Sequence, residues 1–257
     1  MKRPSHLLLI ILLTCDVSYA QVKSVAERLG YPPNSKLLII LADDVGVYHA
    51  ANLASFTALN QRAVTSGTVM QTSPWLTEVA AYAKQHPDIS LGVHLTLCSE
   101  YNTFRWGPVA SKDQAPSLLD PTGYLFPHGS DTVSHAKPVE IERELRAQMD
   151  RAIQFGFNPD FVDSHQRALF SNEELFRLYM KIARDYKLPL KPGLHQFYVH
   201  LAFDDGEAAA ISVDHTAYGA AWRQRDFNVM TSPEFKKALD ENHIILVSWK
   251  DLKKITS

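Results

Sequence analysis

Short apolar runs alternate with longer amphipathic stretches along the chain. The clearest run covers residues 36–42 and ends at Asp43 and Asp44. A continuous apolar run of this length is typical of a strand buried on both faces, as in parallel sheets covered by helices. Similar runs predict further strands at residues 67–72, 89–97, 161–163 and 243–249.

Amphipathic stretches lie between these runs and predict helices. Residues 139–155 repeat apolar side chains on one helical face, and Gly156 is placed to end that helix. Residues 173–186 form a second such stretch, for which Ser171 begins a capping-box pattern, and Pro233 marks the first turn of the last helix. Strands separated by such helices indicate βαβ units, so we expect an α/β fold with a parallel sheet, open or closed into a barrel.

Two long segments interrupt this alternation, at residues 99–137 and 198–228. The first is rich in Pro and Gly and carries several aromatic residues. Loops of this length in a compact domain are usually functional. Tyr101 and Trp106 are its candidates for contacts with a substrate, although packing of the loop onto the fold would use the same side chains.

Residues 1–20 have the pattern of a signal peptide. A basic start precedes an unbroken apolar run at residues 7–13, and Ser18 and Ala20 are the small residues that a signal peptidase requires. We therefore expect export to the periplasm or the medium, with residues 21–257 forming one domain. A buried N-terminal element is the alternative. No other run in the sequence approaches the length needed to span a membrane.

Composition narrows the class of protein. The 257 residues include 26 Lys and Arg against 28 Asp and Glu, and 46% are hydrophobic. This is the balance of a globular protein without the basic excess that nucleic acid or an anionic membrane surface attracts. Cys98 is the one cysteine that follows the predicted signal peptide, so no internal disulfide is expected. The absence of GxSxG, Walker A, GxGxxG and HExxH motifs argues against nucleotide binding and against serine-hydrolase or zincin chemistry.

Acids and histidines lie at or near the ends of the predicted strands. Asp43 and Asp44 end the first strand, His94 lies within a later strand, and His165 follows the strand at 161–163. The carboxyl ends of parallel strands meet at one edge of a sheet, so these side chains are expected to lie together. Taken singly, each has an ordinary alternative: a turn or helix cap for the acids, a buried hydrogen-bonded histidine for His94, and a surface turn for His165.

Taken together, one carboxylate and two imidazoles from three strand ends match an open divalent-metal site with positions left for water and substrate. A second carboxylate beside the ion is a natural general base for hydrolysis. The same ligand set serves iron oxygenases, but its distribution over three α/β strands favours a metal hydrolase.

The motifs around these residues resemble those of the YdjC/ChbG family of carbohydrate deacetylases. The similarity extends over essentially the whole chain after the predicted signal peptide and rests on the order and spacing of short motifs. These are LADDVG at 41–46, VTSGTVM at 64–70, GVHLTL at 92–97, SLLDPTGYLF at 117–126, PDFVDSHQ at 159–166 and RQRDF at 223–227.

This resemblance implies a single (β/α) barrel-like domain of the glycoside hydrolase/deacetylase type. It also implies a metal-dependent deacetylase of N-acetylated sugars such as chitooligosaccharides. Asp44, His94 and His165 match the family's metal site, and Asp43 matches its catalytic base. His215 resembles a late His-Pro motif and is the candidate proton donor or carbonyl-stabilising group. The implied cofactor is a divalent ion, Mg²⁺ or Zn²⁺ in the first place, and the implied partner is a small carbohydrate.

The chain departs from the family pattern at several positions. Phe161 replaces the first histidine of His-x-Asp-Ser-His, Thr216 replaces a proline, and Arg167 lies where the family carries His-x-His. These changes leave the metal triad intact and bear on substrate preference. Arg167 is a candidate substrate contact that would suit an anionic sugar, or it points to solvent. Two other functions stay open: a deacylase of another O- or N-acylated glycan, and a non-catalytic exported sugar-binding protein.

Overall fold

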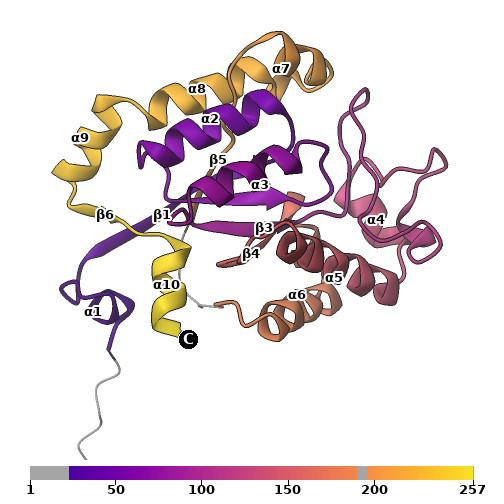
Figure 1. The fold of residues 1–257 in the computed structure, drawn as a ribbon, viewed down its shortest axis with the longest axis horizontal. Helices are drawn as coiled ribbons and strands as arrows, with labels where there is room; N and C mark the ends of the chain where they lie inside the picture. Colours follow the sequence, from indigo (N-terminus) through magenta and orange to yellow (C-terminus); the bar gives the residue numbers. More distant parts are fainter. Residues whose placement is uncertain (1–22, 190–195, 257) are drawn as a thin grey trace, which may run out of the picture.

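The computed structural model in Figure 1 describes residues 23–189 and 196–256. The predicted signal peptide at residues 1–20 lies outside the described residues, so export stays a prediction. Among the helices that are described, none is both long enough and apolar enough to cross a membrane.

In the described part of the chain, six parallel strands form one curled sheet. The order is β4-β3-β2-β1-β5, and β6 pairs with the first residues of β1. The path ends at β4 on one side and β5 on the other, so the sheet is a half-barrel, and the prediction of a barrel-like α/β fold is confirmed. The strands are β1 Lys36–Val45, β2 Ser66–Met70, β3 Leu91–Leu95, β4 Val162–Ser164, β5 Gln196–Val199 and β6 Ile244–Leu246.

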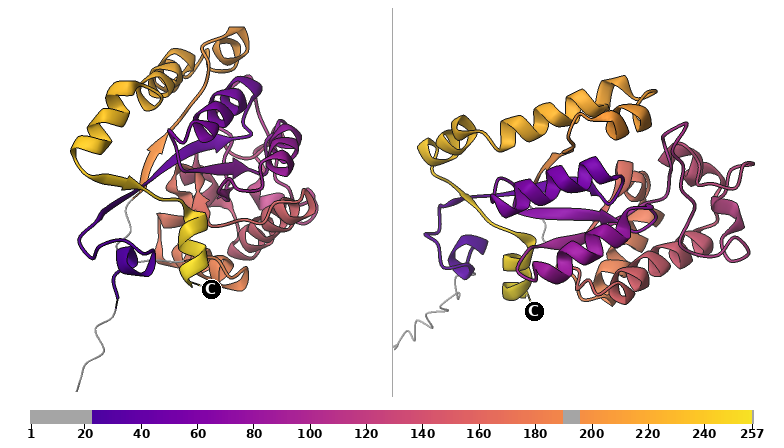
Figure 2. Two further views of the ribbon diagram at one scale, coloured as in Figure 1. Left: turned by 60° about the vertical axis from the view of Figure 1, so that its left-hand side comes forward. Right: turned by 45° about the horizontal axis from the view of Figure 1, so that its top comes forward.

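Helices cover the outer face of this sheet (Figures 1 and 2). α2 packs against α3 and α8, while α5 packs against β3 and α6. In both views of Figure 2, α8 and α9 run along the side of the sheet on which α2 lies. The α-helices are α1 Val25–Arg28, α2 His49–Asn60, α3 Leu76–Gln85, α4 Gly129–His135, α5 Pro138–Gln154, α6 Glu173–Asp185, α7 Gly206–Ile211, α8 Ala220–Met230, α9 Pro233–Glu241 and α10 Trp249–Thr256. Three short 3₁₀ helices are η1 Pro116–Leu118, η2 His165–Phe170 and η3 Thr216–Tyr218.

Several element boundaries differ from the sequence prediction. The strand expected at 243–249 ends at Leu246, and Trp249 begins α10, so the helix opened by Pro233 is not the last. The long segment at 198–228 is largely regular, because it contains the end of β5 together with α7, η3 and α8.

The start of α6 also differs. Asn172, and not Ser171, is its N-cap, and the side chain of Asn172 accepts a hydrogen bond from the backbone N–H of Leu175 at 2.9 Å. Ser171 instead donates to the carbonyl of Ala168 and holds the turn before the helix.

The first strand is buried on both faces, as its apolar run predicted. Ile40 and Ala42 join the large core between sheet and helices, while Ile39 and Leu41 join a second cluster. Alternate residues of a strand face opposite sides, so the second cluster fills the inner face of the half-barrel. Its other buried members are Phe161, Val247, Trp249 and Leu252.

Phe161 is therefore a core residue. Its ring stacks on Trp249 at a centroid distance of 5.2 Å. It also lies against Gly92, where an added Cβ would come within 2.7 Å of the Phe161 ring. The departure from the family pattern at Phe161 thus lies in the core and not among the residues that line the cavity described next, and its effect on substrate preference stays a prediction.

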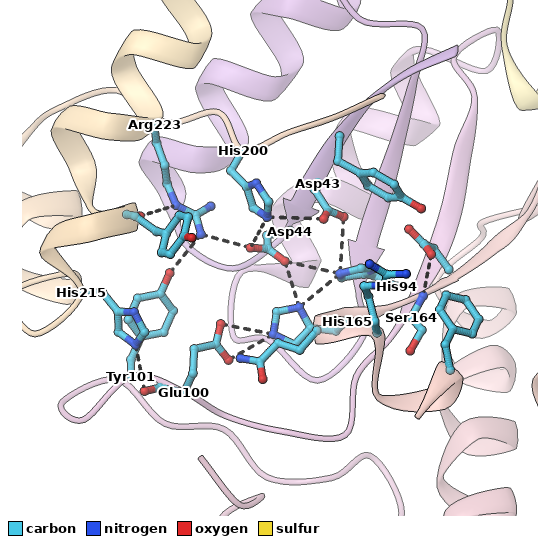
Figure 3. Close-up of a pocket in the computed structure, with 16 residues that line it drawn as sticks. Asp43, Asp44, His94, Glu100, Tyr101, Ser164, His165, His200, His215 and Arg223 are labelled. Atoms are coloured by element: carbon cyan, nitrogen blue, oxygen red, sulfur yellow. Dashed lines mark hydrogen bonds and ion pairs between the residues drawn. The ribbon is translucent and has the colours of Figure 1, made fainter. Parts of the chain in front are cut away.

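An irregularity at the end of β1 sets the direction of two carboxylates. The pairing of β1 with β2 shifts between Ala42 and Val45, where β1 has one residue more than its partner. Asp44 has a φ of 57° in this bulge. Adjacent strand residues normally face opposite sides. Here the left-handed turn lets Asp43 and Asp44 both line one cavity (Figure 3).

Candidate active site

A cavity of about 660 Å³ opens where the carboxyl ends of the strands meet. Its size lies within the range of roughly 300–1,000 Å³ that is usual for small-molecule sites. Of the eight site residues predicted from the sequence, the structure brings seven to this cavity: Asp43, Asp44, His94, Tyr101, His165, Arg167 and His215.

Asp44, His94 and His165 turn three atoms toward one another (Figure 3). Nε2 of His94 lies 3.5 Å from Oδ1 of Asp44 and 3.1 Å from Nδ1 of His165, and this Nδ1 lies 3.1 Å from the same Oδ1. A four-coordinate ion with bonds of about 2.0–2.2 Å separates neighbouring ligands by roughly 3.4 Å, so the triangle has a suitable size.

The surroundings of these atoms also suit a cation. All three side chains are buried, and Oδ1 of Asp44 accepts no hydrogen bond from any residue that the structure describes. A buried polar atom without a partner in the protein requires another one, such as an ion. The triad therefore fits a divalent metal ion.

Arg223 of α8 holds the other oxygen of Asp44. Its Nη2 donates to Oδ2 of Asp44 at 3.1 Å and to the hydroxyl of Tyr101 at 3.2 Å. Burial opposes ionisation of Asp44, but the nearby imidazoles of His165, His94 and His200 keep the pKa of Asp44 well below its usual range. With Oδ2 bound by the guanidinium, Oδ1 is left for a metal.

Glu100 orients His165. Nε2 of His165 donates to the Glu100 carboxylate at 3.1 Å from Oε2, while Nδ1 faces Asp44. Burial alone would lower the pKa of His165, but the negative charges of Glu100 and Asp44 raise it well above its usual value. A carboxylate that receives the far N–H of a histidine fixes the tautomer in which the other nitrogen binds metal. Sequence reasoning missed Glu100, whose signal was its place just after the strand that carries His94.

Asp43 lies beside the triad and is tied from two sides. Thr68 Oγ1 donates to Oδ1 of Asp43 at 2.5 Å, and Nε2 of His94 lies 3.4 Å from that oxygen. Nε2 of His200 lies 3.4 Å from Oδ2 of Asp43. A carboxylate held in this way next to the triad can accept a proton from water.

Asp163 and His200 complete the polar floor of the cavity and were not predicted as site residues. Asp163 is buried, and burial together with the charge of Asp43 raises its pKa to about 6, against the lowering effect of His94. Its Oδ1 accepts the N–H of Ser164 at 2.8 Å. His200 directly follows β5, a strand that the sequence pattern did not reveal.

His215 and Tyr101 line the opposite part of the cavity from Asp43 in Figure 3. Nε2 of His215 donates to the carbonyl of Glu100 at 3.1 Å, and the rings of His215 and Tyr101 meet edge to face at 5.1 Å. Tyr101 is only 3% exposed, so it offers little more than its ring edge and hydroxyl to a ligand.

Trp106 does not line the cavity, unlike the other seven predicted residues. It is 3% exposed, its Nε1 donates to the carbonyl of Cys98 at 2.8 Å, and its ring packs against Tyr101. The expected sugar contact at Trp106 is therefore replaced by packing of the long loop onto the fold.

Arg167 lies at the exposed rim of the cavity. Gln166 and Arg167 have φ values of 49° and 56°, two successive left-handed residues directly after His165. Gln166 accepts a hydrogen bond from the backbone N–H of Gly129, which ties this turn to α4. The Arg167 guanidinium makes no ion pair within the described residues, whereas Arg223, the other arginine of the cavity, is paired with Asp44.

Two of the known proteins that are similar to this chain in sequence are named as deacetylases. A carbohydrate deacetylase of Brevibacillus brevis is 28% identical over 255 residues, which cover 84% of this chain and 99% of the relative. A chitooligosaccharide deacetylase of Yersinia pestis is 30% identical over 171 residues, which cover 64% of this chain and 62% of the relative.

Comparisons of the structure and with family models give the fold and the family. A crystal structure of an Enterococcus faecalis protein is similar with a TM-score of 0.73 at 26% identity, over 85% of this chain and 99% of that chain. The family described as YdjC-like protein matches residues 37–193, which include the triad and Asp43. The chain belongs to the YdjC-like family.

Proposed function

We propose that this protein is a divalent-metal-dependent deacetylase of N-acetylated sugars. The observation that carries the proposal is the buried triangle of Asp44, His94 and His165 with Asp43 beside it, at the floor of a cavity of about 660 Å³. The relatives named carbohydrate deacetylase and chitooligosaccharide deacetylase support the substrate class.

The donor set bears on the choice of metal. Two imidazoles and one carboxylate suit Zn²⁺ and neighbouring transition ions, whereas Mg²⁺ prefers oxygen ligands. When bound, such an ion supplies Lewis-acid activation of the acyl carbonyl and of water. Asp44, His94 and His165 would hold it, with Glu100 and Arg223 fixing the ligands from behind.

Asp43 takes the role of general base in this proposal. Its Oδ1 is engaged by Thr68, so Oδ2 is the oxygen that accepts the proton of the attacking water. His200, 3.4 Å from Oδ2, keeps the Asp43 carboxylate turned toward the triad.

His215 takes the role of general acid. Deacetylation of an amide requires a proton on the leaving nitrogen, and an imidazole is suited to donate one near neutral pH. The hydrogen bond from Nε2 of His215 to the Glu100 carbonyl fixes the ring, which leaves Nδ1 as the nitrogen that carries the proton to the amine.

Acetate release from N,N′-diacetylchitobiose tests the proposal. The purified protein is stripped of metal and assayed alone and after single additions of Zn²⁺, Mg²⁺, Mn²⁺ or Co²⁺. We expect release that depends on added metal, with Zn²⁺ or another transition ion more effective than Mg²⁺. Release from an O-acetylated sugar alone would identify an esterase. If folded, metal-loaded protein releases acetate from neither substrate, the remaining interpretation is a non-catalytic sugar-binding protein.

A further inference from the structure

An apolar strip leaves the rim of the cavity and continues along α6. It consists of Phe170, Phe176 and Met180, which are 38%, 46% and 37% exposed. Phe170 lines the cavity. The Phe170 and Phe176 rings meet edge to face at a centroid distance of 6.2 Å. Phe176 and Met180 are one helical turn apart, so they share a face of α6.

The strip is held rigidly from below. Tyr179 packs against Phe170 at 5.1 Å and against Phe176 at 6.4 Å, and its hydroxyl donates to the carbonyl of Val162 in β4 at 2.9 Å. The Asn172 cap fixes the start of α6 between the two phenylalanines. The rings are therefore a preformed surface attached to the strand that precedes His165.

The chemistry of the strip suits a pyranose chain. The faces of pyranose rings carry C–H groups that pack on aromatic rings, while their hydroxyls need polar partners at the edge. Arg177 and Glu173 form an exposed ion pair on the same helix and can supply such partners. Sugar units that extend a substrate beyond the cavity would meet this strip first, because Phe170 belongs to both surfaces.

The strip is too small to support a stable dimer. At roughly 200 Å² for each large side chain, its exposed part amounts to roughly 250 Å². A stable protein interface buries about 800 Å² on each partner. Its size matches a few sugar units better than a second copy of this chain.

We infer that Phe170, Phe176 and Met180 form an outer subsite for the units of an oligosaccharide that lie beyond the acetylated unit being hydrolysed. The inference rests on the proposed deacetylase function and goes beyond it, because it assigns longer chains as the preferred substrates. Tyr101 and Trp106, the aromatic residues expected from the sequence to bind sugar, are buried, and the exposed rings lie on η2 and α6 instead.

Chain-length dependence tests the subsite. We expect Phe176→Ala to lower kcat/KM for an N-acetylglucosamine pentamer by about tenfold while kcat/KM for the dimer changes by less than about twofold. Phe176→Trp keeps an aromatic ring at this position and should retain the preference for the pentamer that Phe176→Ala loses. Ile153→Ala removes a 52% exposed apolar side chain from α5, outside the cavity, and should change neither value. Equal losses on both substrates, or no loss on the pentamer, would overturn the inference.

A binding experiment separates this inference from the proposed function. Calorimetric titration of the Asp43→Asn protein should show affinity that rises from dimer to pentamer, and the added Phe176→Ala change should remove that rise. If no substrate releases acetate, the proposed function fails, but this titration still decides the subsite. A dimer in sedimentation that Phe176→Ala dissociates would assign the strip to a second copy and overturn the inference.

Discussion

The imidazole of His165 lies between two carboxylates, with Nε2 3.1 Å from Oε2 of Glu100 and Nδ1 3.1 Å from Oδ1 of Asp44. This arrangement makes Glu100 responsible for the tautomer of His165. Glu100→Gln should lower metal affinity about 10–100-fold, the usual effect of losing such a partner, while the protein stays folded.

Calorimetry or competition with a zinc-binding dye measures that affinity. Asp113→Asn provides the control, because Asp113 is an exposed acid on the same long loop and lies outside the cavity. Unchanged affinity in the Glu100 variant would show that other contacts orient His165.

Asp43→Asn should separate metal binding from turnover. Asp43 is not part of the triangle, so metal content should stay close to that of the wild type, while kcat falls by about 10²–10⁴-fold with the loss of a general base. His94→Ala should instead lower the metal content, and turnover should fall as a result. Metal content by mass spectrometry and kcat on the same samples distinguish the two, and substantial turnover by the asparagine variant would remove Asp43 from the base role.

His200 and His215 are the two cavity histidines outside the triad, and replacing each should have a different effect on substrates with different leaving groups. His215→Ala should lose most activity on an N-acetyl substrate but little on an aryl acetate, because a phenolate leaves without a proton. His200→Ala should reduce both activities, since His200 positions Asp43. Rates on the two substrates for each variant provide the measurement. The reverse pattern would exchange the roles of His200 and His215.

Glu144 should make stability depend on pH. It accepts hydrogen bonds from the N–H groups of Val109 and Ala110 and from Gln148, yet its burial raises the pKa to about 7. The folded protein therefore binds this proton more tightly than the unfolded chain, whose Glu pKa is about 4.3. The free energy of unfolding should fall as the pH rises between these two values, by about 4 kcal/mol in all.

Glu144→Gln removes this titration. The difference in unfolding free energy between wild type and variant, from urea unfolding of the metal-free proteins, should shift by about 2–3 kcal/mol between pH 5 and pH 8. Glu142→Gln is the control on the same helix, because the hydrogen bond from Lys181 lowers the pKa of Glu142 and moves its titration below this range. A constant difference for Glu144→Gln would contradict the prediction.

Under the proposed function, Arg167 should determine how the protein responds to charge on the sugar. Arg167→Gln should reduce the preference for a carboxylate-bearing or phosphate-bearing N-acetyl sugar over a neutral one by about tenfold, since one charge-assisted contact is lost. Arg225→Gln removes an exposed arginine of α8 that does not line the cavity and should leave the preference unchanged. Ratios of kcat/KM for charged and neutral substrates give the result, and identical ratios in wild type and Arg167→Gln would place the guanidinium in solvent.

The sequence was informative where polar side chains lie within or directly after a predicted strand. Asp43, Asp44, His94 and His165 all lie at such places, and the structure brings them together as expected. The bulge in which Asp44 has a φ of 57° has no such pattern, because it is defined by the register of β1 against β2.

The residues that sequence reasoning missed depend on weak or distant signals. His200 follows a strand of only four residues, and its apolar run of Phe197, Tyr198 and Val199 is too short to stand out at the edge of the long segment 198–228. Arg223 lies 179 positions from Asp44, so the sequence does not show that it forms an ion pair with Asp44 and lines the same cavity. Trp106 was misjudged because a loop aromatic has the same sequence signal whether it faces a ligand or the core.

The ion pair of Arg223 with Asp44 also bears on how the chain folds. The two residues are 179 positions apart, so a growing chain carries both aspartates and both triad histidines long before the guanidinium emerges. Contacts of such long range close slowly. Until α8 docks, the acidic floor lacks its permanent counter-charge, and a divalent ion can serve in its place. Refolding from urea should therefore be faster with metal present than with a chelator.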